Sequence, residues 1–327
     1  MNIRERRAIH TTAKTVLDRS PEARKIALVY GAVCCGLSLV ATVISALLGQ
    51  KISGTGGLGN IGLRSVLSTG QSVLPLANLI ITTCLSLGYH TAILCFTRGY
   101  DAGTHTLTSG FHHVGAIIRT MLLQALIYSG AGFAAMYLST FIFMATPFSA
   151  DFMAVIEPYV ESLTVLDTTL VLDESLLVAA SEAIVPMLWI LGAVSLVLVL
   201  PLYYRFRMTL FCLADDPRLG AIHALVKSRK LMRRNCFALF RLDLTFWKFY
   251  LGQLLVTLVC YGDVLLPMMG VTLPWSNAVS YYVFFGISLV MQLAVYYFLM
   301  NPAYAAYAVA YDALQEELPE PQNPVQM

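Results

Sequence analysis

Six long apolar runs constrain this chain more than any other feature of its sequence. One of them, Ile26–Leu48, has 23 residues without a charged side chain. An α-helix rises about 1.5 Å per residue, so roughly 20 apolar residues cross the hydrocarbon core of a bilayer. Inside lipid, backbone N–H and C=O groups must bond within their own segment, as they do in a helix. The runs predict an all-α, polytopic integral membrane protein.

Composition and spacing predict a single membrane domain over residues 1–314. Only 12% of the residues are charged, about half the share of a soluble domain. We expect a flexible glycine-rich loop at 50–72 and a disordered acidic, proline-containing tail at 315–327. The expected spans lie at about 26–48, 73–96, 116–144, 185–204, 246–268 and 278–300, and the last continues as helix past Asn301-Pro302 to about 314.

The first 25 residues predict an amphipathic helix that lies on the membrane face. They carry seven basic and three acidic residues. Ile9, Ala13, Val16 and Leu17 recur at helical spacing and form the apolar side. Ser20-Pro21 then reads as the start of the first span, because proline is favoured at the first helical position.

The stretch Arg205–Lys248, between the fourth and fifth spans, is the most strongly charged part of the chain. It holds ten of the 21 Lys and Arg residues and three acids, a local charge of +7. Asp216-Pro217 reads as a helix start. In the following helix the apolar residues are expected on one face: Ile222, Leu225, Val226 and Met232. This pattern predicts a second interfacial amphipathic helix.

The distribution of positive charge predicts the sidedness of the protein. Six spans place both termini on one side, which then carries 19 Lys and Arg residues against two on the other. Between Thr120 and Tyr204 there is no Lys or Arg, but there are seven acids. Because positively charged loops stay in the cytoplasm, we expect a multi-pass protein with both termini cytoplasmic.

The basic residues of this stretch are the candidate binding site. They are expected to contact anionic phospholipid or a membrane protein partner, and no nucleic acid is expected. The other interpretation is that these charges only set the topology. The candidate contacts are Arg205, Arg207, Lys227, Arg229, Lys230, Arg233, Arg234 and Arg241.

No catalytic or cofactor-binding motif is present in the sequence, so we expect a non-enzymatic protein without a cofactor. Three histidines, His105, His112 and His113, could share a helix face, but without a further ligand in register they favour interfacial positions over a metal site. Polar residues within the spans fit either hydrogen bonds between helices or a permeation path. They are Asn78, His90, Gln124, Gln253 and Gln292.

Four segments carry a family resemblance: Pro201–Met208, Ala214–Pro217, Ser228–Asn235 and Leu242–Trp247. With Ala310–Leu314 at the end of the chain, they resemble the bacterial integral membrane family catalogued as domain of unknown function 975. That family is similar in look to the membrane domain of some glycerophosphodiester phosphodiesterases. The resemblance implies a multi-pass protein of the bacterial plasma membrane and no catalytic residue.

Three functional hypotheses follow. The first is an interaction or accessory protein that engages anionic lipid or a membrane partner through its basic cytoplasmic helix, with the acidic tail competing for that helix. The second is a small-solute or ion transporter, which inverted repeats with broken helices would support. The third, which rests on family likeness alone, is an accessory role in lipid or glycerophosphodiester metabolism.

Overall fold

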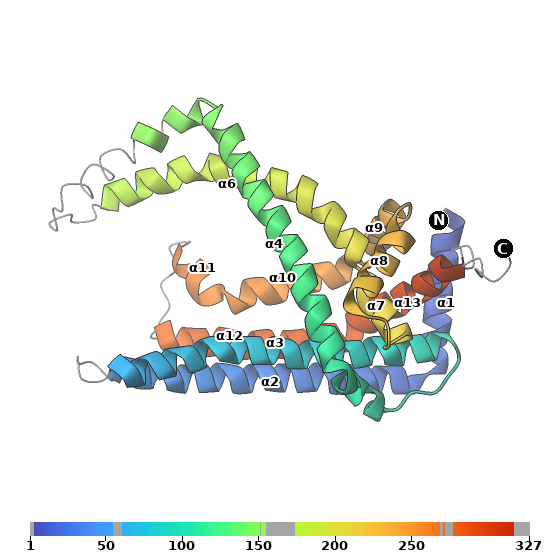
Figure 1. Cartoon of the computed structure of the whole chain (residues 1–327). Coiled ribbons are helices and arrows are strands. Elements are labelled where there is room, and N and C mark those ends of the chain that lie inside the picture. The colour runs from blue at the N-terminus through green and yellow to red at the C-terminus, as the bar shows by residue number, and fades with distance from the viewer. Residues whose placement is uncertain are drawn as a thin grey trace. The chain divides into compact units, whose positions relative to one another are not determined.

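A computed structural model describes residues 3–54, 61–150, 152–154, 174–268, 271 and 277–316. Within these ranges every regular element is a helix (Figure 1). In chain order they are α1 (Ile3–Arg19), α2 (Pro21–Gly54), α3 (Ile61–Thr97), η2 (Thr104–His113), α4 (Val114–Met144), α6 (Glu174–Phe206), α7 (Thr209–Asp215), α8 (Ala221–Met232), α9 (Cys236–Asp243), η3 (Leu244–Phe246), α10 (Trp247–Cys260), α11 (Gly262–Met268), α12 (Asn277–Val295), η4 (Tyr296–Met300) and α13 (Asn301–Glu316).

Six segments are long and apolar enough to cross a membrane, and each overlaps one of the runs expected from the sequence. This confirms the all-α polytopic class. The segments are Pro21–Ile52, Ser65–Thr97, Thr104–Met144, Ile184–Asp215, Cys236–Cys260 and Val279–Glu316.

Two boundaries differ from the sequence-based expectation. The loop expected at 50–72 is largely helical, because α2 continues to Gly54 and α3 begins at Ile61; residues 55–60 lie outside the described part. Most of the glycines of this stretch fall between 54 and 62, and the residues after them favour a helix. The fifth run is interrupted at Tyr261, where α10 ends before α11. A Cβ on Gly262 would lie 2.8 Å from the Phe284 ring, so packing there requires glycine.

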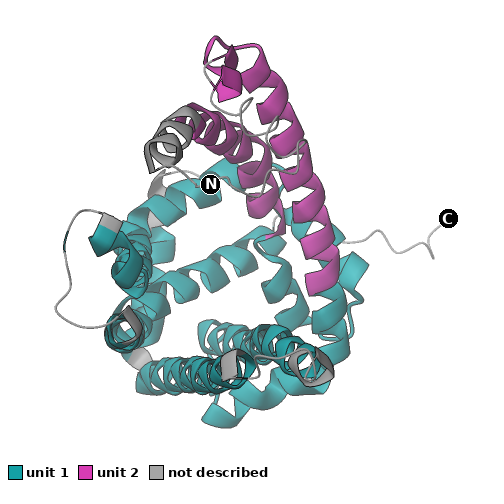
Figure 2. Cartoon of the chain, turned by 90° about the vertical axis from the view of Figure 1, so that its left-hand side faces the viewer, with its two compact units in different colours: residues 1–120, 207–327 teal, residues 121–206 magenta. Residues whose placement is uncertain are grey.

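The chain forms two compact units, residues 1–120 with 207–327 and residues 121–206 (Figure 2). In the first, α2, α3 and α12 run side by side (Figure 1). Helix α1 is the amphipathic helix expected at the N-terminus. It packs against α13 and buries its apolar residues Ile9, Ala13 and Leu17, so this apolar side faces protein where the sequence suggested the membrane.

Two glycines allow η2 to lie directly against α3. A Cβ on Gly88 would come within 2.2 Å of the Leu107 carbonyl oxygen, and one on Gly110 within 2.0 Å of the Cys84 carbonyl oxygen. No other residue fits at these distances. The chain between the two elements turns at Gly99, whose φ is +79°, and this places Arg98 at the end of α3.

The last span changes its helical form just before Pro302. Proline has no N–H, and its ring excludes the carbonyl four residues earlier, so the α-helical hydrogen bonding must open there. The chain does so in the π-helical turn η4 and resumes as α13. Buried Asn301 accepts a hydrogen bond from the Tyr89 hydroxyl (2.6 Å) and donates one to the Ala23 carbonyl (3.3 Å). The expected helix past Asn301-Pro302 is confirmed.

The second unit contains the rest of α4 and α6. Gln124 Nε2 donates to the Phe206 carbonyl at 3.4 Å, and the Tyr128 and Phe206 rings pack edge to face. Helix α6 exposes large apolar side chains, among them Trp189 and Val197. Exposed apolar surface of this kind is typical of helices that face lipid.

Candidate functional site

The eight cations predicted to bind lipid or a partner have different environments. Arg207 and Lys227 pair with acids of the chain, and Arg241 lies over the Phe237 ring with its guanidinium carbon 4.3 Å from the centroid. Arg205 is exposed near the end of α6. Four cations of α8 and the turn after it, Arg229, Lys230, Arg233 and Arg234, are exposed. Arg207 and Lys227 are therefore structural, and the four cations of α8 and the following turn form an exposed surface.

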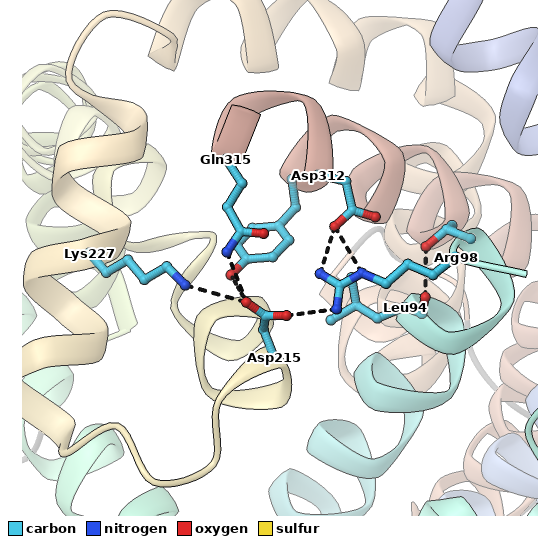
Figure 3. Close-up of polar contacts among 8 residues, drawn as sticks. Leu94, Arg98, Asp215, Lys227, Asp312 and Gln315 are labelled. Atoms are coloured by element: carbon cyan, nitrogen blue, oxygen red, sulfur yellow. Dashed lines mark hydrogen bonds and ion pairs between the residues drawn. The ribbon is translucent and has the colours of Figure 1, made fainter. Parts of the chain in front are cut away.

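Asp215, at the end of α7, is the centre of the first clamp (Figure 3). Its Oδ1 accepts a hydrogen bond from Arg98 Nη1 at 2.7 Å. Its Oδ2 accepts from Gln315 Nε2 at 2.8 Å and from Lys227 Nζ at 3.3 Å. The Tyr311 hydroxyl donates to the same oxygen at 3.1 Å. One carboxylate thus ties α3, α8 and α13 to α7.

Arg98 carries the network on to a second carboxylate. Its Nη2 and Nε donate to Asp312 Oδ1 at 2.7 and 3.2 Å (Figure 3). The hydrogen bonds to Asp312 and Asp215 raise the pKa of the Arg98 guanidinium above its ordinary value. We call Arg98, Asp215, Lys227, Tyr311, Asp312 and Gln315 the Asp215 cluster.

The Asp215 cluster is electrically balanced. It holds two cations and two carboxylates, and the Asp215 side chain is only 16% exposed. Charges removed from water need partners and further hydrogen bonds, and Asp215 has both. The cluster therefore holds the ends of four helices together. Asp312 lies in α13, before the acidic tail expected at 315–327, and binds Arg98. The competition of that tail for the basic helix stays a prediction, because residues 317–327 lie outside the described part.

A second clamp surrounds Arg207. Its guanidinium pairs with Asp243, donates from Nη2 to the Tyr250 hydroxyl at 2.6 Å and lies over the Tyr307 ring at 4.5 Å. The Tyr250 and Tyr307 hydroxyls are 3.0 Å apart. The Arg207 and Asp243 side chains are both largely buried. This clamp joins the start of α7 to α9, α10 and α13.

Helix α8 turns a cationic and apolar face outward. Its inner side buries Leu225 and Met232. Ile222 is 65% exposed and Val226 is 45% exposed, so only part of the predicted apolar face is buried. At 100° per residue, Ile222 and Val226 lie about a quarter turn from Leu225 and Met232, and the core accepts only the second pair.

The four cations of α8 and the following turn have no partner within the described part of the chain. Neither Arg229, Lys230, Arg233 nor Arg234 makes an ion pair or a hydrogen bond through its side chain to a described residue. Arg229 and Arg233 follow Ile222 and Val226 at helical spacing on the same side. We call Ile222, Val226, Arg229, Lys230, Arg233 and Arg234 the α8 outer face.

The other polar residues singled out in the sequence lie elsewhere. His90 is buried beside the Phe211 and Tyr304 rings, and its Nδ1 lies 2.6 Å from the Ser86 carbonyl oxygen. Among the described residues, no group of three or more His, Cys, Asp or Glu side chains is placed to hold a metal ion. His105, His112 and His113 therefore form no such group with described residues.

Sequence reasoning missed the partners in the Asp215 cluster. Arg98 follows the second expected span and received no role, and Asp215 was noted only within the segment Ala214–Pro217. The one available signal was the spacing of Tyr304, Tyr307 and Tyr311, which places three hydroxyl-bearing rings on one side of the last helix. That pattern points to a polar contact surface on α13 without naming its partners.

Comparison with known proteins identifies a family for this chain. No curated protein and no solved structure matches the chain. A family model described as "Protein of unknown function (DUF975)" matches residues 4–314, which include the α8 outer face and all residues of both clamps except Gln315. The chain therefore belongs to the DUF975 family.

Proposed function

We propose that this protein binds anionic phospholipid headgroups through the α8 outer face, as a non-enzymatic accessory protein of a bacterial plasma membrane. The observation that carries the proposal is the surface of α8 and the turn after it, where four exposed cations have no partner among the described residues and two apolar side chains are exposed. Amphipathic helices of this composition lie at the headgroup boundary, with apolar residues toward the acyl chains and cations at the phosphates.

The division of the acids supports this assignment. Asp215 and Asp243 engage Lys227, Arg98 and Arg207, so they leave the positive charge of the outer face uncompensated. Each Lys or Arg near an anionic leaflet contributes on the order of 1 kcal/mol. Four cations together give a preference for anionic over zwitterionic lipid that a binding measurement can detect.

The test compares two variants of equal net charge. In the first, Arg229, Lys230, Arg233 and Arg234 are replaced by Gln. In the control, four exposed cations outside the outer face are replaced by Gln: Lys14, Arg119, Arg218 and Lys248. The full chain is placed in nanodiscs with and without phosphatidylglycerol, and retained lipid is measured by native mass spectrometry.

The first variant should lose about three orders of magnitude in apparent affinity for phosphatidylglycerol, because four contributions of on the order of 1 kcal/mol are removed. The control should stay within about tenfold of the unsubstituted protein. Equal losses in the two variants would contradict a specific outer face. If a protein copurifies in stoichiometric amount and only the first variant loses it, the outer face binds a protein partner and not lipid.

The proposal requires the α8 outer face to be on the cytoplasmic side, where anionic lipids meet basic loops. A thiol reagent that cannot cross membranes should label a Ser175→Cys variant in intact cells and leave a Gln322→Cys variant unlabelled. The reverse labelling pattern would place α8 on the outer side of the membrane and contradict the assignment.

A further inference from the structure

A second polar region lies between the long helices α2, α3 and α12, away from the charged residues. It consists of two cavities of about 520 and 410 Å³. The first is lined by Thr42, Ser45, Gln71 and Tyr281, and the second by Tyr30, Ser86, Gln292 and Tyr296, among others. Ser38 and Asn78 line both, so the cavities meet there. We call the combined space the neutral groove. Each part is within the size range of small-molecule sites, roughly 300–1,000 Å³.

The α2 wall of the neutral groove presents hydroxyl groups without partners. Ser38, Thr42 and Ser45 are four and three residues apart, which places them on one side of the helix. Within the described chain none of these hydroxyls makes a hydrogen bond. Across the groove, Thr82 and Thr83 donate to carbonyls of their own helix at 2.8 and 2.7 Å. The α2 hydroxyls are therefore free both to donate to and to accept from a ligand.

Asn78 supplies a second, independent observation. Its Oδ1 is buried and has no hydrogen-bond partner. A buried polar atom without a partner destabilises a fold by about 1–3 kcal/mol, and such atoms often mark the place of a missing donor. Asn78 lines both cavities, but neighbouring atoms cover Oδ1 itself, so a ligand donor in the neutral groove reaches this oxygen only when the Asn78 side chain turns toward the groove.

The chemistry of the walls selects an uncharged ligand. Among the described residues that line the two cavities, none is Asp, Glu, Lys, Arg or His. An ion in an apolar, membrane-spanning region without a counter-charge is strongly disfavoured. Hydroxyl and amide groups instead complement a partner that donates and accepts at several points, and tyrosine rings such as Tyr281 and Tyr296 offer apolar faces.

We propose that the neutral groove is a binding site for a small uncharged polyol, a molecule that presents several adjacent hydroxyl groups. A free polyol and the polyol headgroup of a neutral lipid share this chemistry. One ligand hydroxyl donates to Asn78 Oδ1, and its neighbours exchange hydrogen bonds with Ser38, Thr42 and Ser45. The proposal does not depend on the α8 outer face, which binds through charge.

Aromatic rings pack behind the part of the neutral groove that Tyr30 lines. Tyr30, at its inner end, stacks on Tyr89 with ring centroids 5.0 Å apart. Tyr89 is fully buried and bonded to Asn301. The opposite end is lined by Gly49 and Gln71, near the ends of α2 and α3 that the 55–60 connection joins.

The test measures protection of a cysteine in the groove. Thr42→Cys and, separately, Ser45→Cys are introduced into the full chain in nanodiscs. Modification by an uncharged methanethiosulfonate is followed by residue-resolved mass spectrometry. The probes are myo-inositol as a free polyol, 1-monooleoylglycerol as a lipid polyol and glucose 6-phosphate as a charged control. Val40→Cys, on the exposed opposite side of α2, is the matched control position.

A neutral probe at ten times its Kd should slow modification at positions 42 and 45 about tenfold, because the free fraction falls as 1/(1 + [L]/Kd). Position 40 should not respond, and adding Asn78→Leu should abolish the protection. Protection by myo-inositol identifies a free polyol, and protection by monooleoylglycerol alone identifies a lipid. Absence of protection by both, equal protection at position 40, or protection by glucose 6-phosphate alone would overturn the proposal.

Discussion

The Asp215 cluster and the neutral groove are two solutions to the same physical problem, polar side chains among apolar helices. In the Asp215 cluster each charge meets an opposite charge, and Asp215 accepts four hydrogen bonds. In the neutral groove, Asn78 Oδ1 accepts no hydrogen bond within the described chain. A region whose polar groups are satisfied internally stabilises the fold, whereas one whose groups are left open is suited to a ligand. Substitutions in the two regions should therefore have opposite consequences.

The largest effect is expected at Asp215. Replacing Asp215 by Asn keeps the shape of the side chain but leaves Arg98 and Lys227 with a single carboxylate between them. Removing one partner of a largely buried ion pair destabilises by about 3 kcal/mol or more. Thermal unfolding in detergent, read as the free energy of unfolding, measures the loss. Asp216→Asn is the control, because this neighbour is exposed and should lose less than about 1 kcal/mol.

Tyr89→Phe should lower the free energy of unfolding by less than Asp215→Asn does. Tyr89→Phe removes the hydroxyl that donates to Asn301 Oδ1 and leaves a buried acceptor unsatisfied. Hydrogen bonds between membrane helices contribute about 1 kcal/mol, so the free energy of unfolding should fall by about that amount. Tyr100→Phe, at an exposed position, should leave stability unchanged. Equal values for the two variants would show that the Asn301 contact contributes no stability.

The neutral groove should behave in the opposite way. Asn78→Leu replaces an amide by an apolar group of nearly the same shape and removes a buried unsatisfied oxygen. Stability without ligand should be unchanged or should rise by about 1 kcal/mol. Thr42→Val is the control for a polar-to-apolar change at an accessible hydroxyl. A loss as large as that of Tyr89→Phe would show that Asn78 is structural and would end the contrast between the regions.

The smallest stability effect per substituted residue is expected on the α8 outer face. The variant with Gln at Arg229, Lys230, Arg233 and Arg234 should unfold within about 0.5 kcal/mol per site of the unsubstituted protein, because exposed cations without partners stabilise little. Circular dichroism during heating provides this value. A collapse of stability here would mean that the lost lipid binding reports unfolding.

The sequence was sufficient to predict the helices because the determinants are local. Uncharged runs near 20 residues predict spans, and Pro302 predicts where the last helix is interrupted. The clustering of cations between Arg205 and Lys248 also located α8 as a charged surface. The predicted apolar face of α8 is only partly buried, because Ile222 and Val226 lie about a quarter turn from the buried Leu225 and Met232. Periodicity defines a helix face but does not say how much of it a neighbouring helix covers.

The pairing of charges could not be predicted, because it depends on long-range geometry. Arg98 is 117 residues from Asp215 and 214 from Asp312, and no local pattern distinguishes Arg98 from Arg119. The same holds for polar residues within the spans. His90 and Asn78 looked alike in the sequence, yet His90 is enclosed by aromatic rings and Asn78 faces an open cavity. Their difference arises from which helices pack beside α3.

The π-helical turn η4 sets the rotational phase of the end of the chain. A π turn accommodates one residue more than the α-helical turn it replaces, and each added residue rotates everything after it by about 100°. Gln292 marks the side of the last span that lines the neutral groove. Because of the π turn, the orientation of that side does not dictate the side of α13 on which Tyr311 and Asp312 lie. Deleting one residue from Tyr296–Met300 would rewind the junction, turning Tyr311 away from Asp215 and Asp312 away from Arg98. This short turn lets one continuous helix serve a ligand-facing bundle and an ionic clamp that need different orientations.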